Sequence, residues 1–455
     1  FLPIAAPLPI ARPGLQLFTW GTNNNGLLGL GVDAAEYARP KLHLWAKNQM
    51  SEGGFGPEPG AGLVSVAAGG MHTLLLDEKG TVWSAGVNDD AALGRITESV
   101  PDANNADSYL DEDELSSHFH PVQALIDEGF RAVQIAAGDN VGAAVSDQGD
   151  LRVWGTFRDH QGHNLFANKK SRQELPVSIL QFTRRVGGLI EKVSSIACGD
   201  NHILVLTTHG NIYAWGMSDD GRLGRKVLSR HKVDATVPQR VVLGRRLRRA
   251  VYVSAGQDTS FAIDDTGDVW AWGLNSMGHT GTGYPSKSND LCVDQPAKVI
   301  GLSPAELGNV DRVVSIAGGE HHTLFLTSQG RVFSCGRCDD GQLGLPGDHE
   351  ALAGADGGRE QGYIVEPVVV DFPGGTVNDP IVKIAAGPRY NMAITQEGVL
   401  FSWGFGSQGE LGLGSGQELR LVSVPTKVTR REGPWSVREV SCGGQHVAGL
   451  FQKRN

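Results

Sequence analysis

A short stretch of this chain combines an aromatic ring, charged side chains and two histidines. It reads GTFRDHQGH and contains, in order, Phe157, Arg158, Asp159, His160 and Gln161. An exposed phenylalanine flanked by charges has the form of an element that inserts into a partner protein. A loop that drifted without function is the alternative interpretation, and the residues alone leave both open.

Two further groups of charges could bind partners. Recurring glycines are followed, within two residues, by an acid at Asp139, Asp200, Asp258 and Glu320. Such an acidic arc could receive a basic protein surface and speed the encounter. A basic cluster, consisting of Arg245, Arg246, Arg248 and Arg249, suggests contacts with phosphates or with an acidic protein patch. A solvated run of charge explains the basic cluster equally well.

Composition limits the classes of function. The net charge of −10 argues against a general nucleic-acid coat, although local basic patches remain compatible with it. No apolar run approaches the roughly 18 residues that a membrane span needs, and five cysteines favour a reducing compartment. Motifs for a serine nucleophile, a zinc protease or a phosphate-binding loop are missing, so nothing proposes bond chemistry.

The spacing of the glycines indicates which elements position these residues. Glycine supplies 62 of 455 residues, roughly twice average usage. An opening glycine, which follows Ala, Cys or Gly, recurs about every 62 residues, at Gly69, Gly138, Gly199, Gly256, Gly319, Gly387 and Gly443. At fixed offsets come a turn glycine and another that usually follows tryptophan. These fixed offsets indicate an internal repeat.

Each repeat is typical of four short strands separated by turns, which is the pattern of a propeller blade. The last repeat stops before its Trp-Gly, and residues 17–31 supply a Trp-Gly half with nothing ahead of it. We therefore predict an all-β, seven-bladed β-propeller whose terminal strands share one blade. Residues 1–14 would form a Pro-rich extension and 15–455 the propeller, with the wedge at about 156–166 and insertions at about 95–120 and 345–363.

The repeats also serve as a control for one another. In most of them the Trp-Gly glycine is followed by glycines at the fifth and eighth positions, but one repeat has His160 and His163 there. Four repeats place a histidine three residues after the opening glycine, at His72, His202, His322 and His446. Because equivalent positions surround a wide axis, these rings would not meet at about 2 Å from one ion. We expect each to fix its own turn by hydrogen bonds, and we predict no metal or cofactor.

The longer insertions are rich in acids or in glycine. Residues 95–120 contain Asp107, Asp111, Glu112, Asp113 and Glu114. Solvated, partly disordered loops are one interpretation, and an acidic contact for a basic partner is the other.

The repeated pattern A-G-G-x-H-T…G-x-V-x-x-W-G-x-N-x-x-G-x-L-G resembles the regulator of chromosome condensation family over about residues 15–451. Repeats of this kind also occur in light receptors, ubiquitin ligases and bacterial inhibitors, so they imply only the fold. The segment Gly155-Thr156-Phe157-Arg158-Asp159…Gly162 is more specific. It resembles the β-wedge of the family's exchange factor for the Ran GTPase, which implies insertion near the GTPase's phosphate-binding loop and magnesium.

The resemblance also implies roles for single residues. Asp139 matches a family acid, whereas the next family aspartate falls on Asn201, with Asp200 one place earlier. Histidines that the family uses in exchange and docking are matched by His321, His322 and His446. The loop Arg245–Arg249 resembles the segment that contacts DNA and the nucleosome acidic patch.

The predicted function is therefore GDP/GTP exchange on a Ran-type small GTPase, without bond chemistry, in a monomer bound to chromatin in the nucleus. A non-catalytic propeller that binds proteins or chromatin is the rival class. A hydrolase on a propeller is a third, and it lacks a nucleophile signature.

Overall fold

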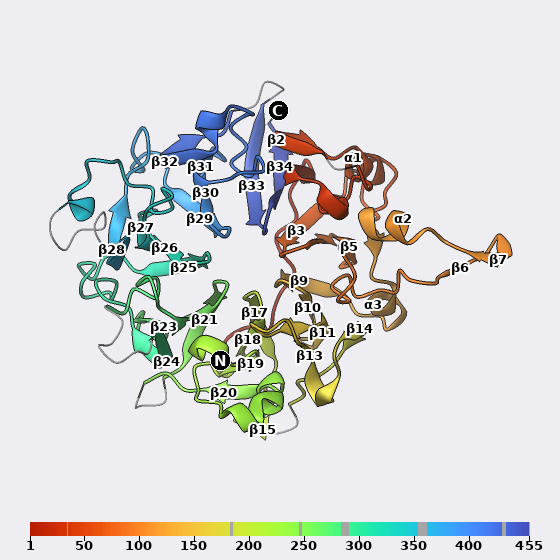
Figure 1. Ribbon diagram of the computed structural model, residues 1–455, viewed down its shortest axis with the longest axis horizontal. Coiled ribbons are helices and arrows are strands. Elements are labelled where there is room, and N and C mark those ends of the chain that lie inside the picture. Colours follow the sequence, from red (N-terminus) through yellow and green to blue (C-terminus); the bar gives the residue numbers. More distant parts are fainter. Residues whose placement is uncertain are drawn as a thin grey trace.

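The computed structural model describes residues 1–33, 35–182, 185–244, 248–283, 291–353, 362–429 and 434–454. Within them, seven four-stranded antiparallel sheets surround one axis (Figure 1). This confirms the predicted seven-bladed β-propeller. In this part of the chain, no helix is long and apolar enough to cross a membrane.

Blades 1 to 6 follow the chain, each from its innermost strand outward. Blade 1 contains β3 (Leu63–Ala68), β4 (His72–Asp77), β5 (Val82–Gly86) and β8 (His120–Pro121). Blade 2 contains β9 (Ala132–Ala137), β10 (Val141–Ser146), β11 (Leu151–Gly155) and β14 (Gln173–Val177). Blade 3 contains β17 (Val193–Cys198), β18 (His202–Thr207), β19 (Ile212–Gly216) and β20 (Gln239–Val241).

The second half repeats this order. Blade 4 contains β21 (Ala250–Ala255), β22 (Thr259–Asp264), β23 (Val269–Leu274) and β24 (Cys292–Lys298). Blade 5 contains β25 (Val313–Gly318), β26 (His322–Thr327), β27 (Val332–Arg337) and β28 (Tyr363–Val370). Blade 6 contains β29 (Ile381–Ala386), β30 (Tyr390–Thr395), β31 (Leu400–Phe405) and β32 (Leu421–Lys427).

Blade 7 joins the two ends of the chain. Its order is β33 (Trp435–Cys442), β34 (His446–Lys453), β1 (Gln16–Thr22) and β2 (Glu36–Leu42). Strand β1 pairs with β34 from Gln16 opposite Phe451 to Gly21 opposite His446. The predicted sharing of one blade is confirmed, and closure removes the open edges that an unclosed array would expose.

Buried tryptophans join neighbouring blades. The indoles of Trp20, Trp154, Trp272 and Trp403 are fully buried, and each donates to a carbonyl in the preceding blade, at Glu410 (2.7 Å), Ala92 (2.8 Å), Arg222 (3.0 Å) and Gln342 (3.1 Å). The accepting residue always stands six positions after its own Trp-Gly glycine. In blade 5 the tryptophan is replaced by Cys335, which is buried in the apolar core.

The recurring histidines also link blades, which corrects the expectation that each fixes only its own turn. Each ring packs so tightly over its opening glycine that a Cβ there would lie 2.2 to 2.6 Å from the ring. The Nε2 atoms of His202, His322 and His446, however, bond to the next blade, at Ser260, Asn391 and Thr73. The reason is geometric: the inner strands converge on the axis, so the neighbouring blade is within reach.

Backbone bonds connect the opening turns around the axis. The residue after the opening glycine donates its N–H to the next blade's turn from Gly70, Asp139, Asp200, Gln257, Glu320 and Gly444. Blade 6 has Pro388 at this position, and proline has no N–H to donate. There the hydroxyl of Tyr390, which replaces the histidine, donates to the Gly443 carbonyl at 2.8 Å. Tyrosine thus restores a connection that proline removes.

The smaller elements lie outside the seven sheets. They comprise the hairpins β6 (Pro101–Asp102) with β7 (Asn105–Tyr109), β12 (Phe157–Arg158) with β13 (Asn164–Leu165), and β15 (Arg185–Val186) with β16 (Leu189–Ile190), the helices α1 (Leu44–Ser51), α2 (Glu112–Ser117) and α3 (Gln123–Asp127), and the 3-10 turns η1 (Asn24–Gly26), η2 (Ala167–Lys169), η3 (Asp219–Gly221), η4 (Ser229–Thr236), η5 (Glu350–Leu352) and η6 (Gln417–Leu419).

The acidic insertion at 95–120 is more regular than a solvated loop. Its hairpin β6–β7 projects far from the ring (Figure 1), and α2 is capped by Asp111, whose carboxylate accepts from the N–H groups of Asp113 and Glu114. Asp111 and the acids of the first turn satisfy the helix N-terminus. Of the second insertion, residues 354–361 lie outside the described residues.

The N-terminal segment lies against other blades before it enters β1. Leu2 donates its N–H to the Thr208 carbonyl of blade 3 at 2.7 Å, and Arg12 makes a two-pronged ion pair with Glu78 of blade 1. The start of the chain therefore lies beside blade 3, away from the blade that its first strand completes (Figure 1).

Candidate functional site

The segment predicted as a wedge forms a small hairpin between blades 1 and 3. Strand β12 pairs with β13, with Phe157 opposite Leu165 and Arg158 opposite Asn164. The tip, residues 158–163, is mostly exposed, and Asp159 holds it closed by accepting from the N–H groups of Gln161 and His163, both at 2.9 Å. We call residues 157–165 the wedge hairpin.

The expectation of an exposed Phe157 is wrong. Its side chain is fully buried and lies parallel to the ring of Phe166, with centroids 5.9 Å apart. Both rings belong to the apolar core between blades 2 and 3. Phe157 anchors the base of the hairpin, because burial of its aromatic ring stabilises the fold and exposure of the ring would not. The polar residues of the tip are the ones that face a partner.

Side chains from both neighbouring blades hold the wedge hairpin. From blade 1, Asp90 contacts Arg158 and Asn164. From blade 3, the side-chain oxygen of Asn201 accepts from the backbone N–H of Arg158 at 2.7 Å. At the tip, His160 Nε2 lies 2.7 Å from a carboxylate oxygen of Asp220, also in blade 3.

The wedge hairpin leaves one donor of the fold without an acceptor. In other blades the tryptophan indole bonds to the carbonyl six residues after the preceding Trp-Gly. For Trp215 that residue is Gln161, which lies at the exposed tip. The Nε1 of Trp215 is buried and has no hydrogen-bond partner within the described residues. An unsatisfied buried donor costs about 1–3 kcal/mol, so this hairpin is not optimised for the stability of the propeller.

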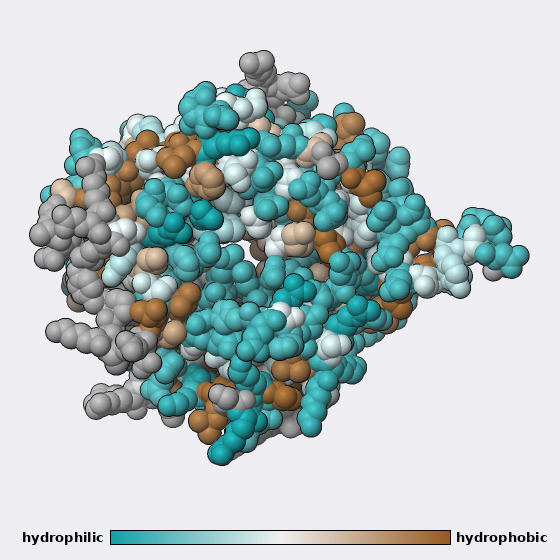
Figure 2. Space-filling view, in the orientation of Figure 1, coloured by the Kyte–Doolittle hydropathy of each residue, from teal (hydrophilic) through white to brown (hydrophobic). Residues whose placement is uncertain are grey.

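The acidic arc lies on the same face, around the axis. Asp139 and Asp200 line a cavity of about 430 Å³ where the opening turns converge, and Figure 2 shows an opening near the centre of the ring. Burial, together with the charges of Asp139 and Asp258, raises the pKa of Asp200 to about 8. Burial also raises the pKa of Asp139. A cation that docks on the arc would favour the ionised carboxylates and lower these pKa values.

A buried arginine connects the arc with the hairpin. The guanidinium of Arg222 is almost completely buried and pairs with Asp258 at 2.7 Å and with Asp220 at 3.0 Å. Asp220 in turn contacts His160. A continuous line of polar contacts therefore runs from the arc to the wedge tip.

The three predicted histidines are not equivalent. His321 is partly exposed beside Glu320, with 24% of its side chain accessible. His322 and His446 are buried, with Nε2 bonded to the next blade. Burial contradicts direct contact between these two rings and a docked protein, because both are enclosed between blades. They support the opening turns around the axis.

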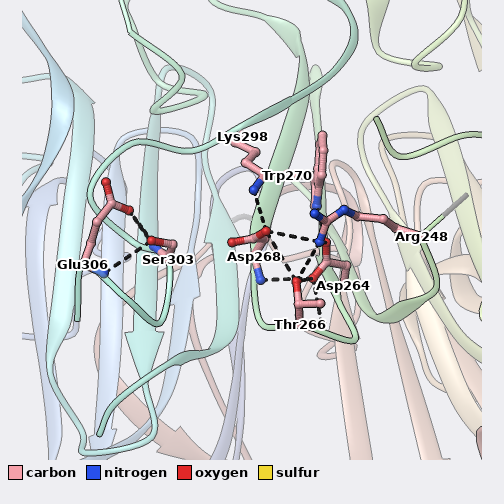
Figure 3. A network of polar contacts seen from close by, with 8 residues as sticks. All are labelled: Arg248, Asp264, Thr266, Asp268, Trp270, Lys298, Ser303 and Glu306. Carbon is pink, nitrogen blue, oxygen red and sulfur yellow. Dashed lines mark hydrogen bonds and ion pairs between the residues drawn. The ribbon is translucent and has the colours of Figure 1, made fainter. Parts of the chain in front are cut away.

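The basic cluster is only partly available for binding. Arg245 and Arg246 lie outside the described residues. Arg248 bonds to Asp264 at 2.9 Å and to Thr266 at 2.7 Å, and it lies 3.3 Å from Asp268, which also pairs with Lys298 (Figure 3). This contradicts Arg248 as a free phosphate contact, because its guanidinium already neutralises these two carboxylates.

Arg249 is exposed and lies over the ring of Phe1, 5.8 Å from its centroid. The contacts of Arg248 are at the Asp264 end of β22, whereas the acidic arc lies at the opposite ends of the strands. Arg248 and Arg249 therefore lie on the face of the ring opposite the wedge hairpin. A separate network on the same side of blade 4 pairs Ser303 with Glu306 (Figure 3).

Sequence reasoning missed Asp90, Asn164, Asp220 and Arg222. A signal was present for two of them, because Asp90 and Asp220 stand four residues after the Trp-Gly glycines of the blades that flank the hairpin. Since the same offset recurs in other repeats, it resembles a structural position. Nothing in the sequence marks Asn164 or Arg222.

Comparison with known proteins agrees with the fold. The model for the RCC1-like domain family matches residues 16–449, and the chain belongs to this family. Its relatives include the guanine nucleotide exchange factor SRM1 of Saccharomyces cerevisiae, 34% identical, with 95% of this chain and 86% of that protein covered. Another is the regulator of chromosome condensation of Xenopus laevis, 29% identical, with 100% and 94% covered.

Among solved structures, Prp20p from Saccharomyces cerevisiae superposes with a TM-score of 0.81 and 30% identity, over 98% of this chain and 94% of that one. That structure is described together with its binding properties to Gsp1p and to histones.

Proposed function

We propose that this protein is a guanine-nucleotide exchange factor for a Ran-type small GTPase. The wedge hairpin carries the proposal, because it replaces a blade turn, is held by both neighbouring blades and deprives Trp215 of its acceptor. A segment that costs stability and is nonetheless held in place is best explained by function. The exchange-factor relative supports the same conclusion.

Exchange on this surface needs no bond chemistry. The GTPase docks on the acidic arc, and the wedge tip contacts its phosphate-binding region, where it competes with the nucleotide and magnesium. If the factor binds the nucleotide-free GTPase more tightly, the nucleotide must be weakened by the same ratio. The cellular excess of GTP over GDP then sets the direction.

The residues divide into contacts and supports. Contacts with the GTPase come from the exposed or partly exposed polar side chains, namely Asp159, His160, Gln161, Asp139, Asp200 and His321. Supports are the buried or internally bonded groups, namely Phe157, Asn201, His322 and His446.

Chromatin binding is the second role. The histone binding described for Prp20p supports it, and so does the position of Arg249 and the N-terminal segment on the face opposite the wedge hairpin. One face can therefore hold nucleosomal DNA or the acidic patch of a histone dimer while the other exchanges nucleotide. This role places the protein in the nucleus.

The test of exchange replaces residues 158–163 by DDAALG, the equivalent turn of blade 1 (residues 89–94), and leaves the buried Phe157 in place. We expect the wild-type chain to accelerate release of fluorescent GDP from Ran, and the replacement to abolish acceleration while the protein stays folded. A non-catalytic binding propeller would instead give no acceleration with either chain.

The test of chromatin binding reverses the charge of Arg245, Arg246 and Arg249. We expect weaker nucleosome binding with a smaller dependence on salt, because fewer counterions are released, and unchanged GDP release. Nucleosome binding equal to that of the wild type would show that these arginines are not part of the interface.

A further inference from the structure

One carboxylate outside the predicted site bonds to both strands of the wedge hairpin. Asp90 stands in the outer turn of blade 1, and its Oδ1 accepts from Asn164 Nδ2 at 2.6 Å. Its Oδ2 forms an ion pair with Arg158 Nη2. Arg158 Nε also donates to Asn164 Oδ1 at 3.2 Å. Each of the three side chains therefore bonds to the other two.

This triangle is placed where it can fix the hairpin's orientation. Arg158 and Asn164 face each other as a cross-strand pair, one in β12 and one in β13. A two-stranded hairpin is at best marginally stable in water by itself, so this one depends on outside contacts. The Asp90 side chain is only 11% exposed, and charge-assisted bonds in a partly dehydrated position are among the stronger ones.

The residue beside Asp90 offers a matched comparison. Asp89 belongs to the same turn, but it is exposed, and its contact with this region is made by its backbone, whose carbonyl oxygen accepts from Arg172 Nη1 at 2.8 Å. Removing the Asp89 carboxylate changes charge and turn composition in the same way as removing that of Asp90. It leaves the triangle intact.

We propose that Asp90 is a positioning residue for nucleotide exchange, which holds the wedge hairpin through Arg158 and Asn164 without touching the GTPase. This inference rests on the proposed function. It also gives the Arg158 side chain a role within this chain, as the link between Asp90 and the hairpin, and leaves contact with the GTPase to residues 159–161 of the tip.

The kinetic test compares Asp90→Ala with Asp89→Ala in GDP release from Ran. For Asp90→Ala we expect the maximal rate to fall about tenfold, since small misplacements of reacting groups are costly, with little change in the half-saturating concentration. Asp89→Ala should match the wild type, and all three chains should melt at similar temperatures. An unchanged maximal rate for Asp90→Ala, or an equal fall for Asp89→Ala, would overturn the inference.

Coupling gives a second test. Arg158→Ala removes two of the three bonds of the triangle and leaves only the bond between Asp90 and Asn164. Adding Asp90→Ala to Arg158→Ala should therefore lower the rate of GDP release from Ran by a smaller factor than Asp90→Ala does in the wild type. Rates that multiply independently would show that Asp90 acts by another route and would contradict the inference.

A third readout needs no GTPase. Amide hydrogen exchange of the free protein should be faster at residues 157–165 in Asp90→Ala and unchanged in Asp89→Ala. If the wild-type chain does not accelerate GDP release from Ran, the proposed function is wrong. If amide protection of residues 157–165 is unchanged in Asp90→Ala, Asp90 does not hold the hairpin. The two failures are therefore distinguishable.

Discussion

The side-chain oxygen of Asn201 accepts a hydrogen bond of 2.7 Å from the backbone N–H of Arg158. The bond joins the opening turn of blade 3 to the first strand of the wedge hairpin. Amide and carboxylate oxygens both accept from a backbone N–H. An asparagine where the family resemblance places an aspartate therefore keeps a contact of this kind.

Substitutions of Asn201 should separate the acceptor from the charge. Asn201→Ala removes the acceptor, so we expect the maximal rate of GDP release to fall several-fold. Asn201→Asp keeps an acceptor, so its maximal rate should stay within about twofold of the wild type. The several-fold loss expected for Asn201→Ala corresponds to the roughly 1 kcal/mol that a hydrogen bond contributes. Stopped-flow release of fluorescent GDP measures both, and a normal rate for Asn201→Ala would remove this bond from the mechanism.

The unsatisfied indole of Trp215 predicts an asymmetry between two identical substitutions. Trp154→Phe breaks a 2.8 Å bond to the Ala92 carbonyl, whereas Trp215→Phe removes a donor that has no partner among the residues that the structure describes. Both lose similar packing, so Trp154→Phe should be more destabilising by about 1–2 kcal/mol. Thermal melting compares the two variants. Equal losses would contradict the link between the wedge hairpin and the missing acceptor.

Blade 6 offers a rescue experiment. Tyr390→Phe removes the hydroxyl that bonds to the Gly443 carbonyl, and we expect a lower melting temperature from the loss of a buried hydrogen bond. Adding Pro388→Ala restores the backbone N–H that the other blades use, so it should recover part of the loss. If the double variant melts no higher than Tyr390→Phe, the tyrosine does not compensate for the proline.

The buried histidines predict a loss of stability in acid. Burial lowers the pKa of His202, His279 and His446 to about 3, and that of His43, His72 and His322 to about 4. Unfolded histidines take up protons near pH 6.5, so the unfolded state binds more protons below that pH and stability falls. Their contribution is complete above pH 6.5 and declines as the pH falls toward 4.

Four carboxyl groups act in the opposite sense, because burial raises the pKa of Asp77, Asp139, Asp200 and Glu410. Since the histidines outnumber them, we expect the melting temperature to drop between pH 6.5 and 4.5. The drop should be smaller for His202→Gln, which has one buried imidazole fewer. A melting temperature that is constant or rises toward pH 4.5 would contradict this balance.

The repeat made the fold predictable, because the same turn pattern occurs seven times and each copy indicates the same blade structure. Blade number, strand number and ring closure all follow from glycine offsets. The sequence could not show which blade a buried histidine bonds to, because the partners Ser260, Asn391 and Thr73 are ordinary core positions of another repeat. Such contacts depend on how closely the blades approach at the axis.

The sequence identified the part of the site that departs from the repeat pattern. It did not identify the residues of the site that stand at ordinary positions of that pattern. Missing glycines at His160 and His163 marked the wedge hairpin correctly as a departure. Asp90 and Asp220, by contrast, follow the turn pattern and bond to the hairpin only because it replaces the turn between them. The burial of Phe157 depends on the ring of Phe166, and nothing local in the sequence places that ring beside it.

The most direct measurement of the central claim is release of fluorescent GDP from Ran, with excess GTP, in the presence of the wild-type chain or the chain whose residues 158–163 are replaced by DDAALG. The account predicts strong acceleration by the wild type and none by the replacement. It also predicts that the replacement melts at a higher temperature, because Trp215 regains an acceptor. Acceleration by both chains, or by neither, would contradict the account.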